Sequence, residues 1–377
     1  MEVICFSDIY WDFLWQRHQQ LLTRLPKHWK ILYIEPSFLG TLVKHPRNSI
    51  PRHVSDTITV LSFPTFPLFD RNSLLRKINS GLIVFWTLFF MKLFRIKNPL
   101  VIIYEPRFSC VIGRIREFLS CYEIADDRLE FSQVPRWIEN NIDMLIKNVD
   151  IVTVSASNLY KKAFEKRKKD LFLIGNGVDV DHFRKVREDI ELPHDIVNVK
   201  KPVLGYFGAI GDWFDFTLVE KILKLCPELS VVLIGPVFPE QEDIVRTLEI
   251  RYSNIHVLGK KPYSVLPYYI KAFDVCLIPF KINELTRGVN PNKFYEYASA
   301  GKPVVTTDLP ELYKYRDIIF LANDHMQFIS LINESLHSKT EVNSLLRVAE
   351  TNTWDSKAEE FIRIITQYAS KKERSNE

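Results

Sequence analysis

The chain has 377 residues, of which 46% are hydrophobic, so its length favours two domains and its apolar content is enough for two cores. The formal net charge is +4 and no long run of Lys or Arg occurs, which argues against a nucleic-acid-binding protein. The five scattered cysteines form no CxxC pair, so neither a zinc site nor a disulfide framework is predicted, and reduced thiols in a cytosolic compartment fit best.

Predicted strands and helices alternate from the start of the chain. No signal peptide is predicted, because the apolar run at the N-terminus is too short and its start is acidic. Stretches with helical spacing, such as 135–147, lie between most of the short apolar or β-branched runs. The predicted strands of this first series are 3–6, 31–34, 57–61, 100–104, 120–124, 151–154 and 171–174. This alternation indicates a parallel sheet covered by helices on both faces.

An apolar segment, GLIVFWTLFFM, occupies residues 81–91. It is about half as long as a transmembrane helix requires. Basic residues flank it at Lys77, Lys92, Arg95 and Lys97. Three interpretations stay open: a buried helix of the first domain, an in-plane contact of the 82–94 region with an anionic membrane surface, and a transmembrane helix.

A charged stretch, 180–201, interrupts the alternation and is interpreted as a linker. A second series of predicted strands follows it: 203–207, 231–234, 255–257, 275–278, 304–306 and 318–321. We therefore predict an α/β protein with two doubly wound, Rossmann-like domains, 1–185 and about 200–350, that face each other across a cleft. Ligands of such sheets bind beyond the carboxyl ends of strands, so the loops of interest follow Phe6, Phe207, Ile234, Val257 and Ile278.

The segment 290–305 carries the most informative pattern. Pro291 suits the first turn of a helix, and Gly301 suits the position just after its end. Lys293 and Glu296 then lie in the first turns of a helix whose amino end faces the cleft, where free N–H groups and the helix dipole favour phosphate. A carboxylate there can accept hydrogen bonds from ribose hydroxyls, and a lysine can meet a diphosphate. The alternative is a helix with surface charges and a glycine cap.

The same segment resembles the donor-site signature of the group 1 glycosyltransferase superfamily. Its members carry a glutamate five residues before a Gly-Lys-Pro-Val-Val-type strand entry, as Glu296 and Gly301 do here. Further segments that resemble family motifs are 176–179 (Asn-Gly-Val-Asp), 205–211, 233–236, 257–260 and 272–279. A narrower resemblance, to bacterial polysaccharide and teichuronic-acid-type glycosyltransferases, rests on WQRHQQ at 15–20 and YIEP at 33–36. The resemblance implies the GT-B fold, with an acceptor domain, a donor domain and a helix over 354–370 that returns to the first domain.

The resemblance also implies a set of donor-binding residues, with departures from the family pattern. Gly288 replaces the second glutamate, eight positions before the first, and Glu284 is the nearest substitute. Loop 209–215 lacks the usual Arg and Lys, so backbone N–H groups of the glycine loop must hold the diphosphate, helped by Lys293 or Arg287. The expected donor-binding residues are Gly208, Gly211, Gly235, Lys260, Glu284, Arg287, Asn290, Lys293 and Glu296.

Polar residues of the first domain are candidates for the acceptor side. Asp126 and Asp127 end a predicted strand, where paired carboxylates can orient an acceptor hydroxyl or accept its proton. The alternative is a helix cap with a first-turn acid. Arg17 and His18 follow the first strand and are expected to contact acceptor or phosphate, with a structural role equally open. The DxD at 179–181 lies in a turn between the domains, so no metal site is predicted.

Together these features predict a glycosyltransferase that moves a sugar from a nucleotide-sugar donor to a glycan or lipid-linked acceptor in cell-surface polysaccharide synthesis. The donor is a substrate and no cofactor is expected; the family resemblance implies metal-independent transfer with retention. The alternatives are a non-hydrolysing sugar-nucleotide epimerase-like GT-B enzyme and a non-catalytic nucleotide-sugar-binding partner. We expect a cytoplasmic location, peripheral on the inner face of the plasma membrane if segment 82–94 contacts lipid.

Overall fold

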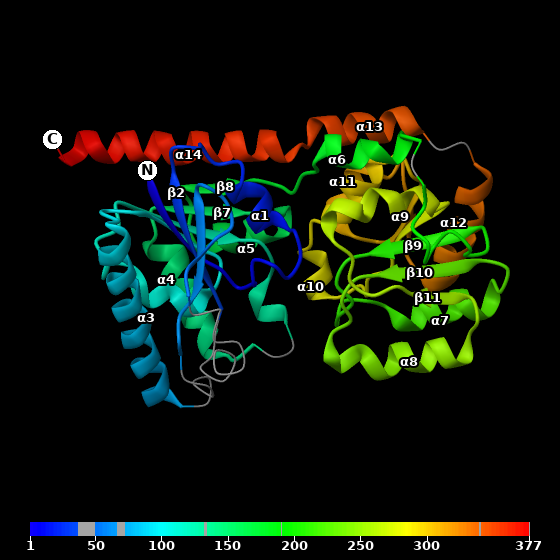
Figure 1. Cartoon of the computed structure of the whole chain (residues 1–377), viewed down its shortest axis with the longest axis horizontal. Coiled ribbons are helices and arrows are strands. Elements are labelled where there is room, and N and C mark those ends of the chain that lie inside the picture. Colours follow the sequence, from blue (N-terminus) through cyan, green and yellow to red (C-terminus); the bar gives the residue numbers. More distant parts are fainter. Residues whose placement is uncertain (37–49, 66–71, 132–133, 190, 339–340, 377) are drawn as a thin grey trace. The chain divides into compact units, whose positions relative to one another are not determined.

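The structure is a computed structural model that describes residues 1–36, 50–65, 72–131, 134–189, 191–338 and 341–376. The chain separates into two compact units (Figure 1). Unit 1 comprises Met1–Gly175 together with Lys357–Glu377, and unit 2 comprises Asn176–Ser356. The division after Gly175 lies earlier in the chain than the boundary expected near residue 185.

Unit 1 is built on an eight-stranded sheet in the order β3-β4-β2-β1-β5-β6-β7-β8. Neighbouring strands are parallel except for the antiparallel pair of β3 and β4. The strands are β1 Glu2–Phe6, β2 Lys30–Glu35, β3 Arg52–His53, β4 Ile58–Ser62, β5 Leu100–Ile103, β6 Leu119–Ile124, β7 Ile151–Val154 and β8 Leu171–Leu173. Ile4 and Phe6 of β1 lie in one apolar cluster, whereas Val3 and Cys5 lie in another. Because successive side chains alternate, the sheet is buried on both faces, as parallel sheets are.

Helices cover both faces of this sheet (Figure 1). On the face of Ile4 lie α3 Ser73–Phe94, α4 Trp137–Asn148 and α5 Ser157–Lys166. On the other face lie α1 Arg17–Leu22 and α14 Trp354–Asn376. Helix α14 begins in unit 2 and belongs to unit 1 from Lys357 onward, where Phe361 and Ile365 are buried in the apolar cluster. Two short 3-10 helices, η3 Pro106–Val111 and η4 Arg128–Glu130, follow β5 and β6.

Helix α3 contains the apolar segment 81–91, and only its inner face is buried. Ile83, Phe90 and Met91 join the apolar cluster of unit 1. The helix is long and apolar enough to cross a membrane by length and composition, but 28% of its most apolar window is buried against the protein. Large apolar side chains of the outer face are exposed: Leu74, Ile78, Phe85, Leu88, Phe89 and Leu93. The buried-helix interpretation therefore accounts for one face of α3 only.

Unit 2 is built on a six-stranded parallel sheet in the order β11-β10-β9-β12-β13-β14. Its strands are β9 Val203–Phe207, β10 Ser230–Ile234, β11 Ile255–Val257, β12 Val275–Ile278, β13 Val304–Thr307 and β14 Phe320–Ala322. Its helices are α6 Val180–Arg184, α7 Phe216–Leu225, α8 Glu242–Arg251, α9 Leu266–Ala272, α10 Glu284–Arg287, α11 Asn292–Ser299, α12 His325–His337 and α13 Val342–Thr351. One apolar cluster runs through the unit, so the two predicted parallel-sheet bodies are confirmed.

The predicted linker, 180–201, is in part a helical segment of unit 2 rather than a connector. The carboxylate of Asp179 accepts a hydrogen bond from the N–H of His182 (3.1 Å) and so caps α6. Phe183 is fully buried in the core of the unit. Sequence patterning missed this helix because a single buried aromatic among charged residues produces no apolar run.

Candidate functional site

Two glycines bring the carboxyl ends of β9 and β10 into close contact. Gly208 and Gly235 have φ angles of +128° and +144°, which residues with a side chain rarely adopt. A Cβ on Gly235 would lie 2.0 Å from the carbonyl oxygen of Gly208. The N–H of Gly208 donates to Ile234 (2.8 Å), and that of Gly235 donates to Gly259 (2.9 Å). Both glycines lie at the carboxyl ends of the strands, as predicted. The N–H of Gly208, however, is bonded to the carbonyl of Ile234 rather than free for a diphosphate.

The side chain of Lys293 fills the space that the missing side chain of Gly208 leaves. A Cβ on Gly208 would meet the Cε of Lys293 at 2.4 Å and its Nζ at 2.6 Å. The Nζ also lies 5.2 Å from the ring centroid of Tyr206 and 5.5 Å from that of Phe280, at the cation–π range. A positive charge is thus held directly over the carboxyl end of β9.

Helix α11 carries this lysine, and its ends follow from the sequence. The helix starts after Pro291 and stops at Ala300. Gly301, with φ +67°, lies just after the helix as predicted; it donates to Ala298 (3.0 Å), and Lys302 donates to Tyr297 (3.1 Å), which is a Schellman arrangement. Since Lys293 near the first turn lies against Gly208, the amino end of α11 points to the carboxyl edge of the sheet.

Glu296 lies one turn further along the same helix and is 6% exposed. Burial raises the pKa of its carboxyl to about 7, and the positive charge of Lys293 limits that rise. The carboxyl therefore titrates close to neutral pH. A ligand that donates hydrogen bonds to this group would favour its charged form.

The loop before α11 is fixed by the Asn-Gly-Val-Asp turn. The side-chain amide of Asn176 donates to the backbone carbonyl of Asn290 at 2.6 Å. A Cβ on Gly177 would lie 2.9 Å from the carbonyl oxygen of Asn352, so the turn packs backbone to backbone on the end of α13. Asn290 is 6% exposed, and its position supports the start of α11.

The remaining predicted donor residues lie in loops of unit 2. Glu284 and Arg287 form an ion pair of 2.9 Å within α10, and both side chains are more than half exposed. Gly288, in place of the family glutamate, ends α10. Gly211 lies under Trp213, whose ring atoms a Cβ would meet at 2.8 Å, and Lys260 is exposed beyond β11.

In unit 1, charged residues gather where β1, β5 and β6 end. His18 contacts Asp8 through Nε2 and Oδ1 (2.8 Å), and its ring packs on Tyr104 with centroids 3.8 Å apart. Arg128 contacts Glu105 at 2.6 Å and Asp8 at 3.7 Å. Burial raises the pKa of Asp8, but His18 and Arg128 outweigh it and leave this pKa below its ordinary value.

Of this group, the sequence pointed to His18 but not to Asp8, Glu105 or Arg128. A usable signal existed, because Asp8 follows the first strand and Glu105 follows β5, at the edge where ligands bind. The Nδ1 atom of His18 is buried and has no hydrogen-bond partner among the described residues. Asp8 thus holds the imidazole through Nε2, and Nδ1 forms no hydrogen bond within the described structure.

Two of the predicted site residues, Arg17 and Asp127, form ion pairs within unit 1, which favours the structural role left open for each of them. Arg17 is buried; its Nε contacts Glu123 (2.6 Å), and its remaining nitrogens donate to the carbonyls of Ile174 (2.8 Å) and Gly175 (3.0 Å). Asp127 forms an ion pair of 2.7 Å with Lys162 and stands at the N-cap position of η4, where its side chain makes no capping hydrogen bond. Each of these side chains forms an ion pair with a residue far away in the chain, and sequence spacing does not reveal such partners.

Asp126 remains the exposed carboxylate of the predicted pair. The crowded surroundings of its carboxyl group and the negative charge of Asp8 raise its pKa above the ordinary value. Among the described residues, no group of three or more His, Cys, Asp or Glu side chains is arranged to hold a metal ion. In the DxD segment, Asp179 caps α6.

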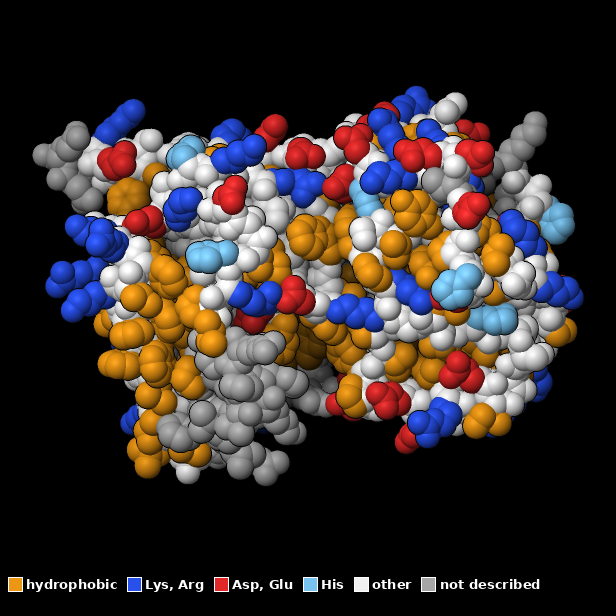
Figure 2. Space-filling view, in the orientation of Figure 1, with side chains coloured by type: hydrophobic (Ala, Val, Ile, Leu, Met, Phe, Trp, Pro, Cys, Tyr) orange, Lys and Arg blue, Asp and Glu red, His pale blue; other side chains and the backbone are white. Residues whose placement is uncertain are grey.

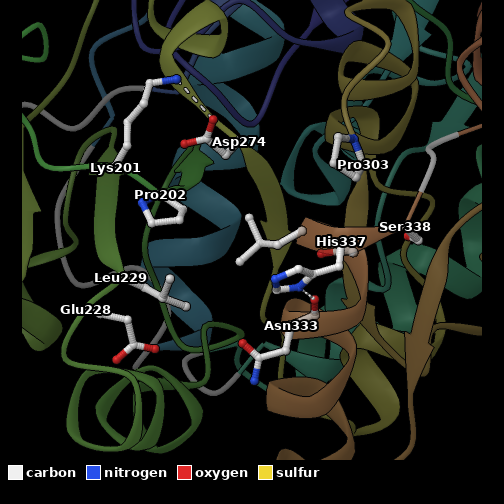
Figure 3. Close-up of a pocket in the computed structure, with 11 residues that line it drawn as sticks. Lys201, Pro202, Glu228, Leu229, Asp274, Pro303, Asn333, His337 and Ser338 are labelled. Carbon is white, nitrogen blue, oxygen red and sulfur yellow. Dashed lines mark hydrogen bonds and ion pairs between the residues drawn. The ribbon is translucent and has the colours of Figure 1, made fainter.

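An open pocket of about 670 Å³ lies at the amino ends of the strands of the unit 2 sheet (Figure 3). Its lining includes Pro202, Leu229, Asp274 and Pro303, which immediately precede β9, β10, β12 and β13. Lys201 at its rim is paired with Asp274 at 3.0 Å. Since open α/β sheets bind ligands beyond the carboxyl ends of their strands, this pocket is separate from the edge that carries Lys293.

Comparison with known sequences and structures agrees with this geometry. Residues 201–338, which contain Gly208, Lys293 and Glu296, match a family described as glycosyl transferases group 1. A protein of Bacillus subtilis (strain 168), described as a teichuronic acid biosynthesis glycosyltransferase, TuaH, is 24% identical over 222 residues. That match covers 56% of this chain and 55% of the relative, so it spans about half the relative's length.

Solved structures resemble the chain over nearly its whole length. Anabaena Alr3699/HepE, in complex with UDP and glucose, superposes with a TM-score of 0.70 at 16% identity, covering 97% of this chain and 99% of that one. Sucrose-phosphate synthase from Thermosynechococcus elongatus superposes with a TM-score of 0.76 at 14% identity, covering 98% of this chain and 99% of that one. The predicted GT-B fold is thereby confirmed.

Proposed function

Residues 201–338 match the group 1 glycosyl transferases family and the chain has the GT-B fold, and on this premise we propose that the protein moves a sugar from a nucleotide-sugar donor to a glycan or lipid-linked acceptor. The observation that carries the proposal is the contact of Lys293, at the amino end of α11, with Gly208 at the carboxyl end of β9, with the buried Glu296 one turn further along the helix. The resemblance to a protein described as a teichuronic acid glycosyltransferase supports a role in cell-surface polysaccharide synthesis.

In this proposal each donor residue has a separate task. The carboxylate of Glu296 accepts hydrogen bonds from ribose hydroxyls, and these donors favour its charged form against the burial that raises its pKa. The ammonium of Lys293 meets the diphosphate, whose negative charge grows as the bond to the sugar breaks. The N–H groups at the start of α11 add the positive end of the helix dipole.

The charged cluster of unit 1 is proposed to bind the acceptor. Asp8 holds His18 through Nε2, so the imidazole has a fixed orientation beside the exposed Asp126. Asp126, exposed and with a raised pKa, is suited to accept a proton from such a hydroxyl. Arg128 holds Asp8 and Glu105 in place through ion pairs.

The test is release of nucleoside diphosphate from a panel of nucleotide-sugars supplied with membrane or glycan extracts. UDP-glucose leads the panel because the Anabaena protein was solved in complex with it. Acceptor-dependent release that stops in Lys293→Ala supports the proposal. Tight binding of a donor with no release from any extract would instead favour a non-catalytic nucleotide-sugar-binding partner.

One observation favours that second candidate function. Gly288 ends α10 where the family pattern has a glutamate near the donor sugar, and the nearest carboxylate, Glu284, is engaged with Arg287. Gly288→Glu would restore the missing group. If this variant gains turnover that the native chain lacks, the native chain is the binding partner; if both turn over, the native chain is the enzyme.

A further inference from the structure

The outer face of α3 is an apolar stripe that the described part of the chain leaves uncovered. Its members are spaced at helical intervals, so they lie along one side: Leu74, Ile78, Phe85, Leu88, Phe89 and Leu93. Phe85 is 57% exposed and Phe89 is 47% exposed. The stripe runs about 28 Å along the helix at 1.5 Å per residue. Figure 2 shows hydrophobic side chains gathered over α3.

Charge on α3 has one sign. The helix contains no Asp or Glu, whereas Lys77 and Lys92 are exposed within it, and Arg95 and Lys97 follow its end. Figure 2 shows Lys and Arg side chains gathered beyond its carboxyl end. A helix with an apolar face and basic borders is suited to lie in the plane of an anionic bilayer surface.

The inner face of α3 excludes a spanning orientation for this fold. Ile83, Phe90 and Met91 pack in the apolar cluster on the sheet of unit 1, and Thr87 beside them is fully buried. To cross a bilayer the helix would have to leave that cluster and expose the sheet. A surface orientation keeps these contacts and buries only the outer stripe.

We propose that the outer face of α3 docks unit 1 on an anionic membrane surface, with Phe85 and Phe89 entering the lipid and the flanking lysines and arginines meeting lipid phosphates. A second copy of the chain fits the face less well, because a symmetric pair would bring basic ends of the same sign together. The inference does not rest on the proposed function, since docking requires no turnover.

Vesicle flotation of the full chain tests this docking. Vesicles with a large share of phosphatidylglycerol should carry the protein at low salt, and less of it at high salt. Vesicles of phosphatidylcholine alone should carry markedly less. Absence of binding to anionic vesicles at low salt would overturn the proposal.

Two variants assign the binding to α3. Phe85→Ser combined with Phe89→Ser should lower the partition coefficient about tenfold or more, because both rings lose their burial in lipid. The matched control is Ile244→Ser with Ile250→Ser on α8 of unit 2, where the side chains are 40% and 82% exposed, and it should bind as the native chain does. Equal losses in the two variants would overturn the assignment.

Lys77→Glu with Lys92→Glu separates charge from apolar contact. This variant should lose binding to anionic vesicles and should lose little of any binding to neutral ones. Light scattering of the native chain and of the Phe85→Ser, Phe89→Ser variant measures the oligomeric state of each, and so tests whether a second copy of the chain covers this face. A native dimer that becomes monomeric in this variant would show that a second copy, and not lipid, covers the face.

Discussion

The side-chain amide of Asn176 donates to the backbone carbonyl of Asn290 at 2.6 Å, and so joins the first residues of unit 2 to the loop that starts α11. Asn176→Ala leaves this buried carbonyl without its donor, which should lower the free energy of unfolding by about 1–3 kcal/mol. Asn176→Asp should cost more, because it sets an acceptor against an acceptor. Thermal unfolding compares the two; equal stability of Asn176→Asp and the native chain would contradict the assigned hydrogen bond.

Gly208→Ala should couple to Lys293. The new Cβ would lie 2.4 Å from the lysine Cε and would also force a residue with a side chain into φ +128°, a strain of about 1–3 kcal/mol. In the background of Lys293→Ala only the strain remains, so the loss should be smaller there. A double-mutant cycle of unfolding free energies that is additive would show that the lysine can move aside without cost.

Glu296→Gln should lower donor affinity roughly 10- to 150-fold, because a charge-assisted hydrogen bond is worth about 1.5–3 kcal/mol. Lys293→Ala should weaken binding of the nucleoside diphosphate more than that of the nucleoside, since its proposed partner is phosphate. Calorimetric titration of both ligands into both variants measures the difference. Unchanged affinity in Glu296→Gln would remove this residue from the site.

The pKa of Glu296 predicts a pH-dependent stability. Its ordinary value is 4.5 and burial raises it to about 7, so the folded protein binds the proton more tightly than the unfolded chain. Stability should therefore fall as pH rises from about 4.5 to 7, by up to about 3 kcal/mol, and Glu296→Gln should not show this fall. Denaturant unfolding of both proteins across this range checks it; parallel curves would contradict the pKa shift.

Arg17→Ala should destabilise unit 1 by about 3–5 kcal/mol, because it leaves the carboxylate of Glu123 buried without its partner. The matched control is Arg184→Ala, which removes an ion pair with Glu350 at the surface and should cost at most about 1 kcal/mol. Chemical unfolding of the two variants gives both values. If Arg17→Ala cost as little as the control, Arg17 would be free for the acceptor role expected from the sequence.

Turnover should persist in EDTA. The motive is the structural use of the DxD segment, where the carboxylate of Asp179 caps α6. The measurement is donor turnover with EDTA and after addition of manganese. Activity that disappears in EDTA and returns with manganese would revive Asp179 and Asp181 as a metal site.

Local patterns predicted the parts of the structure that local physics determines. The alternation of apolar runs located the sheets, and Gly301 marked the end of α11 because a left-handed position after a helix favours glycine. The choice between a structural and a functional role for Arg17 and Asp127 could not be made from sequence, because their partners, Glu123 and Lys162, lie far away in the chain. The raised pKa of Glu296 was also unpredictable, since it depends on burial that only the packed unit shows.

Helix α14 affects when unit 1 can fold during synthesis. The apolar cluster on one face of its sheet includes Phe361, Ile364 and Ile365, which are translated after all of unit 2. A ribosome-bound chain that ends before these residues exposes the apolar side of β1, β2 and β5. Unit 2 is a continuous segment and can form its core first, whereas this face of unit 1 stays open until α14 has been translated.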